Sequence, residues 1–153
     1  MKNKMSHSFN NPDYDLEDFP FYWISRVNGR YLKAMEESLK ALDLDNTRRR
    51  VLVTLSKRDN VSVSDIVDHT IMKISTVTKI VYRLKDEGLV DTYSCPDDAR
   101  ITRVHLTEKG AAIVVQVNDA SHRVLSNSFE GLTKAQLLRL NTMLMTIFHN
   151  LPE

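Results

Sequence analysis

The sequence predicts a mainly α-helical chain that carries a small β-hairpin between two of its helices. Apolar residues recur at steps of three and four along most of the chain, as they do in amphipathic helices. Between residues 89 and 106 the pattern changes to two strand-like runs. The 153 residues include only four glycines and four prolines, so each of these marks a boundary between elements. This length corresponds to one domain with a core of its own.

A polar segment, residues 1–18, precedes the first predicted helix, and we expect it to be a flexible arm. Pro20 suits the first turn of a helix, where the missing N–H of proline needs no partner. Helical spacing of apolar residues then continues from Trp23 to Leu42. The chain is therefore expected to begin with an arm and one long amphipathic helix.

Local capping signals predict the next three helices. Asp45 is placed to cap the second helix, and Ser62 with Asp65 forms an S-x-x-D start for a short third one. A fourth helix is expected over residues 73–87, ended by Gly88, where a left-handed conformation costs least. The buried stripe of this fourth helix is expected to contain Ile74, Val77, Ile80, Val81 and Leu84.

Residues 89–94 and 101–106 have the composition of two β-strands. They flank a polar turn over residues 95–100, so we expect an antiparallel hairpin with a long tip. We assume a register in which Thr92 lies opposite His105.

Two more helices are predicted after the hairpin. Thr107 can cap the first, which ends near Gly131, and Thr133 with Gln136 fits a capping box for the second. The last helix carries a regular apolar seam: Leu137, Leu140, Leu144, Ile147 and Leu151. Such a seam is more apolar surface than a small domain usually exposes, so we expect another helix to cover it.

The order helix, short helix, turn, helix and hairpin over residues 45–107 defines a winged helix-turn-helix. The outward face of the fourth helix is small and polar, which lets its backbone approach the bases in the major groove of DNA. The side chains of this helix expected to contact DNA are Lys73, Ser75, Thr76, Thr78, Lys79 and Arg83. Arg100 at the hairpin tip can enter the narrow minor groove. A solvated helix face beside a charged turn is the alternative interpretation.

Three stretches carry a further signal. They are S-T-V-T-K-I-V-Y-R-L-K-D-E-G-L-V over residues 75–90, D-x-R from Asp98 to Arg100, and L-T-E-K-G over residues 106–110. Together they resemble the winged helix-turn-helix of MarR-type transcriptional regulators. Residues 44–52 are similar to the segment that opens the second helix in that family. The resemblance extends over residues 20–150, almost everything except the arm.

The resemblance implies a transcriptional repressor that binds double-stranded DNA as a homodimer. Residues 19–44 and 108–153 would form the dimer. Residues 45–107 would form the DNA-binding domain, and this domain in each copy would read one half of a near-palindrome. In the family the wing aspartate braces the wing arginine, roles that fall on Asp98 and Arg100. Recognition-helix contacts fall on Ser75, Thr76, Thr78 and Lys79. A winged-helix module that binds another protein and no DNA is the alternative function.

Three positions depart from the family pattern. Ile71 stands where the turn often has glycine, Lys73 where serine often starts the recognition helix, and Ala99 where a second wing arginine is frequent. We expect these changes to shift site preference or weaken affinity without removing DNA binding.

Many members of the family are released from DNA by a phenol or an aromatic carboxylate, bound between the dimer helices and the winged domain. An aromatic surface beside a guanidinium suits such a planar anion, because stacking holds the ring and a bidentate fork holds the carboxylate. The candidate residues are Tyr22, Trp23, Arg26, Arg30 and Arg49. Alternatively, Trp23 belongs to the dimer core and the arginines pair with Glu36, Glu37 or the acidic end of the arm.

The sequence offers little for other chemistry. Its glycines are too far apart for a phosphate-binding loop, and one cysteine with five scattered histidines predicts neither a cofactor nor a metal site. In the assumed register Cys95 and His105 are roughly 10 Å apart, too far for a nucleophile and its base, so we expect no enzyme. Cys95 is expected to be an inert strand residue, with redox sensing as the alternative.

No secretory signal is evident, and no apolar run approaches the roughly 20 residues that cross a bilayer. The formal net charge is +1, so bulk charge indicates no polyanionic partner. We expect a cytoplasmic protein with no membrane partner.

Overall fold

The computed structural model describes residues 15–58 and 61–152. Its elements in chain order are η2 (Leu16–Asp18), α1 (Pro20–Leu39), η3 (Lys40–Leu42), α2 (Asn46–Lys57), β1 (Val61–Ser62), α3 (Val63–Thr70), α4 (Ile74–Asp86), β2 (Val90–Ser94), β3 (Thr102–Leu106), α5 (Glu108–Ser128) and α6 (Lys134–Asn150). The predicted mainly helical class is confirmed. Of the predicted arm, residues 1–14 lie outside the described residues.

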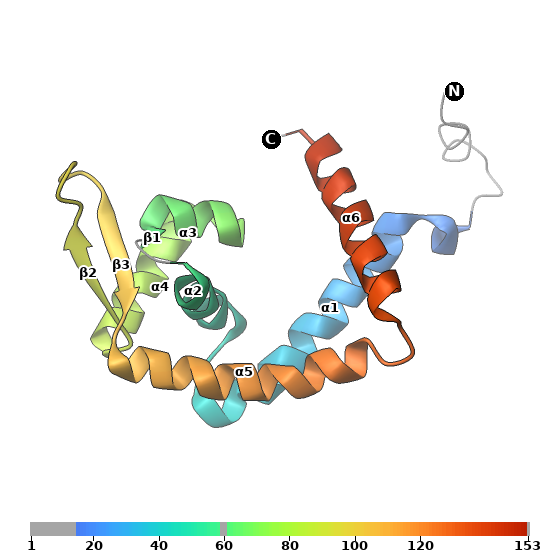
Figure 1. Ribbon diagram of the computed structural model, residues 1–153, viewed down its shortest axis with the longest axis horizontal. Coiled ribbons are helices and arrows are strands. Elements are labelled where there is room, and N and C mark those ends of the chain that lie inside the picture. Colours follow the sequence, from blue (N-terminus) through green and yellow to red (C-terminus); the bar gives the residue numbers. More distant parts are fainter. Residues whose placement is uncertain (1–14, 59–60, 153) are drawn as a thin grey trace.

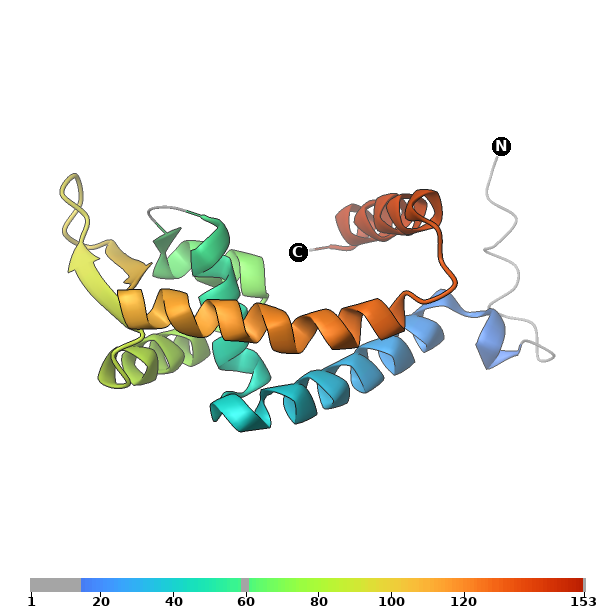
Figure 2. The same ribbon diagram turned by 60° about the horizontal axis from the view of Figure 1, so that its bottom comes forward.

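The helices and the small sheet are arranged in two parts (Figure 1). At one end, α2, α3 and α4 pack around the sheet, and β2 and β3 project from it as a wing. From there α5 runs away alongside α1, and the two helices pack side by side (Figure 2). α6 stands apart from both, and none of its residues is buried. No helix in residues 15–58 and 61–152 is long and apolar enough to cross a membrane.

The core lies where α2, α3 and α4 meet the sheet and the first half of α5. The side chains with almost no exposed surface include Leu52 of α2, Ile66 of α3, Leu84 of α4, Val104 of β3 and Val117 of α5. Leu39 at the end of α1 joins the same cluster. This core fixes α4 against α2 and α3, so the opposite face of α4 is directed away from the protein.

The predicted helix caps are present. Asp45 accepts from Arg48 N, Thr107 accepts from Gly110 N, and the pairs Ser62–Asp65 and Thr133–Gln136 form capping boxes. Gly88 ends α4 with φ +72°, as expected for a left-handed glycine. The positions of the helix starts therefore follow from residues three apart in the sequence.

The sheet differs from the predicted hairpin in two respects. A third strand, β1, pairs with β3 on the side away from β2. The assumed register is wrong by one residue, because Thr92 lies opposite Val104 and His105 opposite Asp91. The physical reason is burial: Val104 is 1% exposed, and a slip of one residue would turn its side chain to the solvent.

Ile74 is a second feature in which the structure differs from the sequence prediction. Val77, Ile80, Val81 and Leu84 are buried as predicted, but Ile74 is 60% exposed. It lies on the first turn of α4, at the edge of the stripe, and borders the opening between α4 and the wing instead of the core.

Ile71 occupies the turn between α3 and α4 with φ +51°, in the left-handed region. A β-branched residue rarely adopts this conformation, because its side chain crowds the backbone. The side chain is 76% exposed, so burial does little to offset the strain.

Ile71→Gly is expected to raise the free energy of unfolding by about 1 kcal/mol, since glycine reaches this conformation without strain. Denaturant unfolding followed by circular dichroism measures the change. Asparagine also tolerates the left-handed region, so the free energy of unfolding of Ile71→Asn is expected to lie between those of the wild type and Ile71→Gly. A less stable Ile71→Gly protein would mean that the isoleucine side chain contributes more than its backbone conformation costs.

Candidate nucleic-acid interface and effector site

The face of α4 opposite the core carries most of the residues that the sequence predicts to contact DNA. Ser75, Thr76 and Lys79 are exposed on it. Lys73 is the exposed N-cap residue of α4, and its side chain makes no capping bond. Because the serine and threonine side chains are short, the two lysines are the parts of this surface that extend furthest from the helix.

Two other predicted contact residues are engaged within the chain. Thr78 is half-buried, and its hydroxyl donates to the carbonyl of Ile74 at 2.8 Å. Arg83 Nε pairs with Glu87 Oε1 at 3.0 Å, and the same oxygen accepts from the buried Arg48 at 2.8 Å. Arg83 is therefore held toward the C-terminal end of α4, while Arg48 ties that end to the start of α2.

Asp98 braces Arg100 at the tip of the wing. Oδ1 of Asp98 accepts from the backbone N and from Nε of Arg100, both at 3.0 Å, and Oδ2 accepts from Nη2 at 2.9 Å. These hydrogen bonds hold the pKa of Asp98 below its usual value, so the brace stays ionised at neutral pH. The Arg100 side chain is nevertheless 90% exposed, which presents its guanidinium to the solvent in one orientation.

The wing is tied to both helices of the helix-turn-helix. Lys85 of α4 donates to Thr92 Oγ1 at 2.7 Å and pairs with Asp91 at 2.9 Å. Arg103 of β3 pairs with Asp65, at the start of α3, at 3.9 Å. No sequence pattern marks Lys85 as a positioning residue, because its partners lie on another element with no fixed spacing from it.

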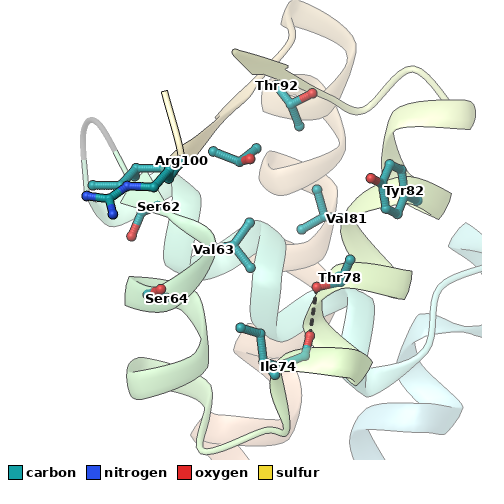
Figure 3. Close-up of a pocket in the computed structure, with 11 residues that line it drawn as sticks. Ser62, Val63, Ser64, Ile74, Thr78, Val81, Tyr82, Thr92 and Arg100 are labelled. Atoms are coloured by element: carbon teal, nitrogen blue, oxygen red, sulfur yellow. Dashed lines mark hydrogen bonds between the residues drawn. The ribbon is translucent and has the colours of Figure 1, made fainter. Parts of the chain in front are cut away.

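A cavity of about 290 Å³ separates α4 from the wing. Figure 3 shows Ile74, Thr78 and Tyr82 along α4, with Arg100 coming from the wing. Arg100 is the one charged residue among the eleven that line the cavity, and none of them is acidic. The fold thus brings the wing arginine and one side of α4 to a common opening.

The five residues predicted to bind an effector fall into separate groups. Near the start of α1, Arg26 lies over the ring of Tyr22 at 5.2 Å, and the indole N–H of Trp23 donates to the carbonyl of Glu17 at 2.7 Å. Arg30 is exposed further along α1. In the described residues neither Arg26 nor Arg30 forms an ion pair with Glu36 or Glu37, and Glu37 pairs with Lys40 instead.

Arg49 forms a second group with Tyr31 and Asn46, which no sequence pattern marks as binding residues. Its Nη2 donates to the hydroxyl of Tyr31 at 2.8 Å, and its guanidinium lies 5.8 Å from the centre of that ring. Asn46 Nδ2 donates to the carbonyl of Leu32 at 2.8 Å. Arg49 Nε and Asn46 Oδ1 are buried without a hydrogen-bond partner. A buried polar atom without a partner is costly and calls for an explanation at that place.

Cys95 directly follows β2, where the turn at the tip of the wing begins, and is 7% exposed. A backbone hydrogen bond from Asp97 and the nearby Arg103, whose Nη2 is 3.8 Å from Sγ, lower the pKa of the thiol. In the observed register His105 is about 13 Å from Cys95 along the strands. Among the described residues no three His, Cys, Asp or Glu side chains are grouped to hold a metal ion.

α3 and α4 form a helix-turn-helix in which α4 is the recognition helix, and β2 and β3 add a wing whose arginine is braced. This arrangement defines a winged helix-turn-helix regulator of transcription. A model of the MarR family matches residues 44–102. The HTH-type transcriptional repressor IacR of Pseudomonas putida is 47% identical over 151 residues, which cover 97% of this chain and 90% of that protein. The chain belongs to the MarR family.

Solved structures share the fold over nearly the whole chain. CouR of Rhodococcus jostii bound to p-coumaroyl-CoA has a TM-score of 0.82 at 22% identity and covers 91% of this chain and 98% of its own. A cysteine-to-serine mutant of MarR from E. coli, complexed with operator DNA, has a TM-score of 0.75 at 24% identity. The match covers 87% of this chain and 98% of the mutant. The similarity thus includes α1, α5 and α6 as well as the winged domain.

Proposed function

We propose that the chain is a transcriptional repressor that binds a near-palindromic operator in double-stranded DNA as a homodimer. In each half-site α4 lies in the major groove, and Arg100 enters the adjacent minor groove. The observation that carries the proposal is the guanidinium of Arg100, braced by Asp98 and 90% exposed beside α4. Fixing a long cationic side chain in advance reduces the entropy that it loses on entering a narrow groove.

The cations of α4 support the same proposal. Lys73 and Lys79 are exposed, and within the described part of the chain neither has an ion-pair partner. Unpaired cations on α4, together with the exposed Arg100 of the wing, favour a polyanionic partner, because phosphate contacts release counterions. IacR is named a repressor, and the mutant MarR is complexed with operator DNA. A winged-helix module that binds another protein would not need this set of cations.

The exposed apolar surface of α6 supports the homodimer. Its exposed side chains include Leu138, Leu140, Leu144 and Phe148, and Trp23 and Val27 of α1 are 47% and 63% exposed. A monomer rarely leaves so many large apolar side chains of its helices in water. The first and last helices of a second copy would cover it, and the twofold axis would then set the spacing of the two α4 helices.

Selection of duplexes from a random library by the purified protein is expected to enrich a near-palindrome. Arg100→Ala is expected to weaken binding to the enriched duplex by about tenfold or more, since it removes one minor-groove contact from each half-site. Its affinity should also fall less steeply with salt than that of the wild type.

Arg123→Ala, which removes an exposed arginine of α5, is the matched control and should keep the wild-type affinity. Failure to enrich any sequence at low salt would overturn the proposal and favour the protein-binding module. Equal affinities of Arg100→Ala and wild type would exclude the wing from the interface.

We further propose that a small aromatic or phenolic carboxylate releases the repressor, and that Arg49 anchors it. The unpartnered Nε of Arg49 can donate to a carboxylate, and the unpartnered Oδ1 of Asn46 can accept from a phenol. Tyr31 offers an aromatic face beside both. CouR was crystallised with an aromatic ligand, p-coumaroyl-CoA. Tyr22, Trp23, Arg26 and Arg30 stay in the proposal as its outer residues, although Tyr22 lies about 13 Å from Tyr31 along α1.

Release would follow from a shift between two spacings of the α4 helices. The group around Arg49 joins α1 of the dimer region to α2 of the winged domain, so a ligand there acts on the angle between the two parts. A ligand that stabilises a spacing unlike that of the half-sites weakens operator binding. By reciprocity, operator DNA weakens ligand binding by the same factor.

Arg49→Gln is expected to require at least about tenfold more aromatic acid for release of labelled operator, because a charge-assisted bond is lost. Operator affinity without the acid should be unchanged. Arg58→Gln, at the far end of α2, is the control that should respond like the wild type. An acid that releases wild type and Arg49→Gln at equal concentrations would exclude Arg49, and equal binding of the acid with and without operator would exclude the coupled mechanism.

A further inference from the structure

One side of α4 carries exposed apolar groups in a line toward the wing. Ile74 is 60% exposed and Tyr82 is 65% exposed, and the half-buried Thr78 lies between them. Their spacing of four residues places them on the same side of the helix, as Figure 3 shows. Together with Val81 they line the cavity on its α4 side, and Arg100 lines it from the wing.

This line is separate from the stripe that builds the core. The buried side of α4 is already complete with Val77, Ile80, Val81 and Leu84, so the chain does not need Ile74 for its own packing. A single exposed apolar residue would call for no explanation. Here, however, the apolar line lies beside the exposed cations Lys73 and Lys79.

The charges around the line indicate its occupant. The cavity wall contains Arg100 and no acidic residue. A partner that suits this setting has anionic groups at its edges and an apolar group between them. Duplex DNA fits, because phosphates border the major groove and the C5-methyl of thymine is the apolar group on the base edges.

The position of Ile74 decides what it can reach. Residues in the first turns of a recognition helix contact base edges, whereas later residues approach the backbone. Ile74 is the first residue of α4, while Tyr82 lies about 12 Å further along the helix. An isoleucine offers no hydrogen bond to a base, so its contribution to discrimination is limited to apolar contact.

We propose that Ile74 is a specificity-determining residue that contacts the C5-methyl group of a thymine in each half-site. The inference rests on the proposed operator binding and adds to it the kind of base that this side of α4 reads. Sequence preference at that position thus comes from the presence of a methyl group, in addition to hydrogen bonds from α4.

The test replaces thymines of the selected operator by deoxyuracil, which removes only the methyl group. For the wild-type protein, replacement of one symmetric pair of thymines is expected to weaken binding, by about fourfold for each half-site. Ile74→Ala is expected to bind the thymine and deoxyuracil duplexes with equal affinity at that pair. Because Ile74 is largely exposed, truncation leaves the core intact, which a thermal melt of the variant checks.

Tyr82→Phe is the matched control, because it alters the same line of α4 but leaves Ile74 in place. It is expected to keep the wild-type ratio between the thymine and deoxyuracil duplexes. If Ile74→Ala discriminates the duplexes as the wild type does, or if no thymine methyl affects wild-type binding, the proposal is wrong while operator binding stands. If the wild type binds no selected duplex, the proposed function itself fails and this proposal fails with it.

Discussion

The close approach of α5 to the backbone of Leu89 is the constraint on which the rest of the structure depends. A Cβ atom on Gly110 would lie 1.9 Å from the carbonyl oxygen of Leu89, so only glycine fits there. Thr107 completes the junction, with its N–H donating to Leu89 O and its hydroxyl to Gly88 O. The end of α4, the first strand of the wing and the start of α5 therefore meet at one point. A rotation of α5 must move the recognition helix and the wing together.

The same junction explains how two distant parts of the chain can be coupled. α5 packs along α1, and Arg49 and Asn46 of α2 hydrogen-bond to α1. The winged domain is thus joined to both α1 and α5, which we propose to be part of the dimer region. The ligand that we propose beside Arg49 would not need to touch DNA to act on it, because a change in the angle between the two parts would alter the spacing of the two α4 helices.

The sequence predicts much of this fold because its signals are local. Ser62 with Asp65 and Thr133 with Gln136 set helix starts over three residues, and the conformation of Gly88 ends α4. The features that the sequence does not predict depend on contacts between elements that are far apart in the chain. Ile74 has the spacing of a core residue, and only the position of the wing leaves it uncovered. The contact of Arg49 with Tyr31 likewise joins two helices, so no local pattern could indicate it.

Site-directed cleavage of DNA is the most direct test of the proposed homodimer and of the position of its wings. Cys95 is the one cysteine of the chain, so Ala99→Cys in a Cys95→Ser background places a single iron chelate beside Arg100 at the wing tip. On the selected operator we expect two sets of minor-groove cuts, related by the symmetry of the palindrome, one from the wing of each copy. One set of cuts would contradict the homodimer. Scattered cuts, or cuts in the major groove, would contradict the proposed position of the wing in the minor groove. They would also contradict the proposed position of α4 in the adjacent major groove.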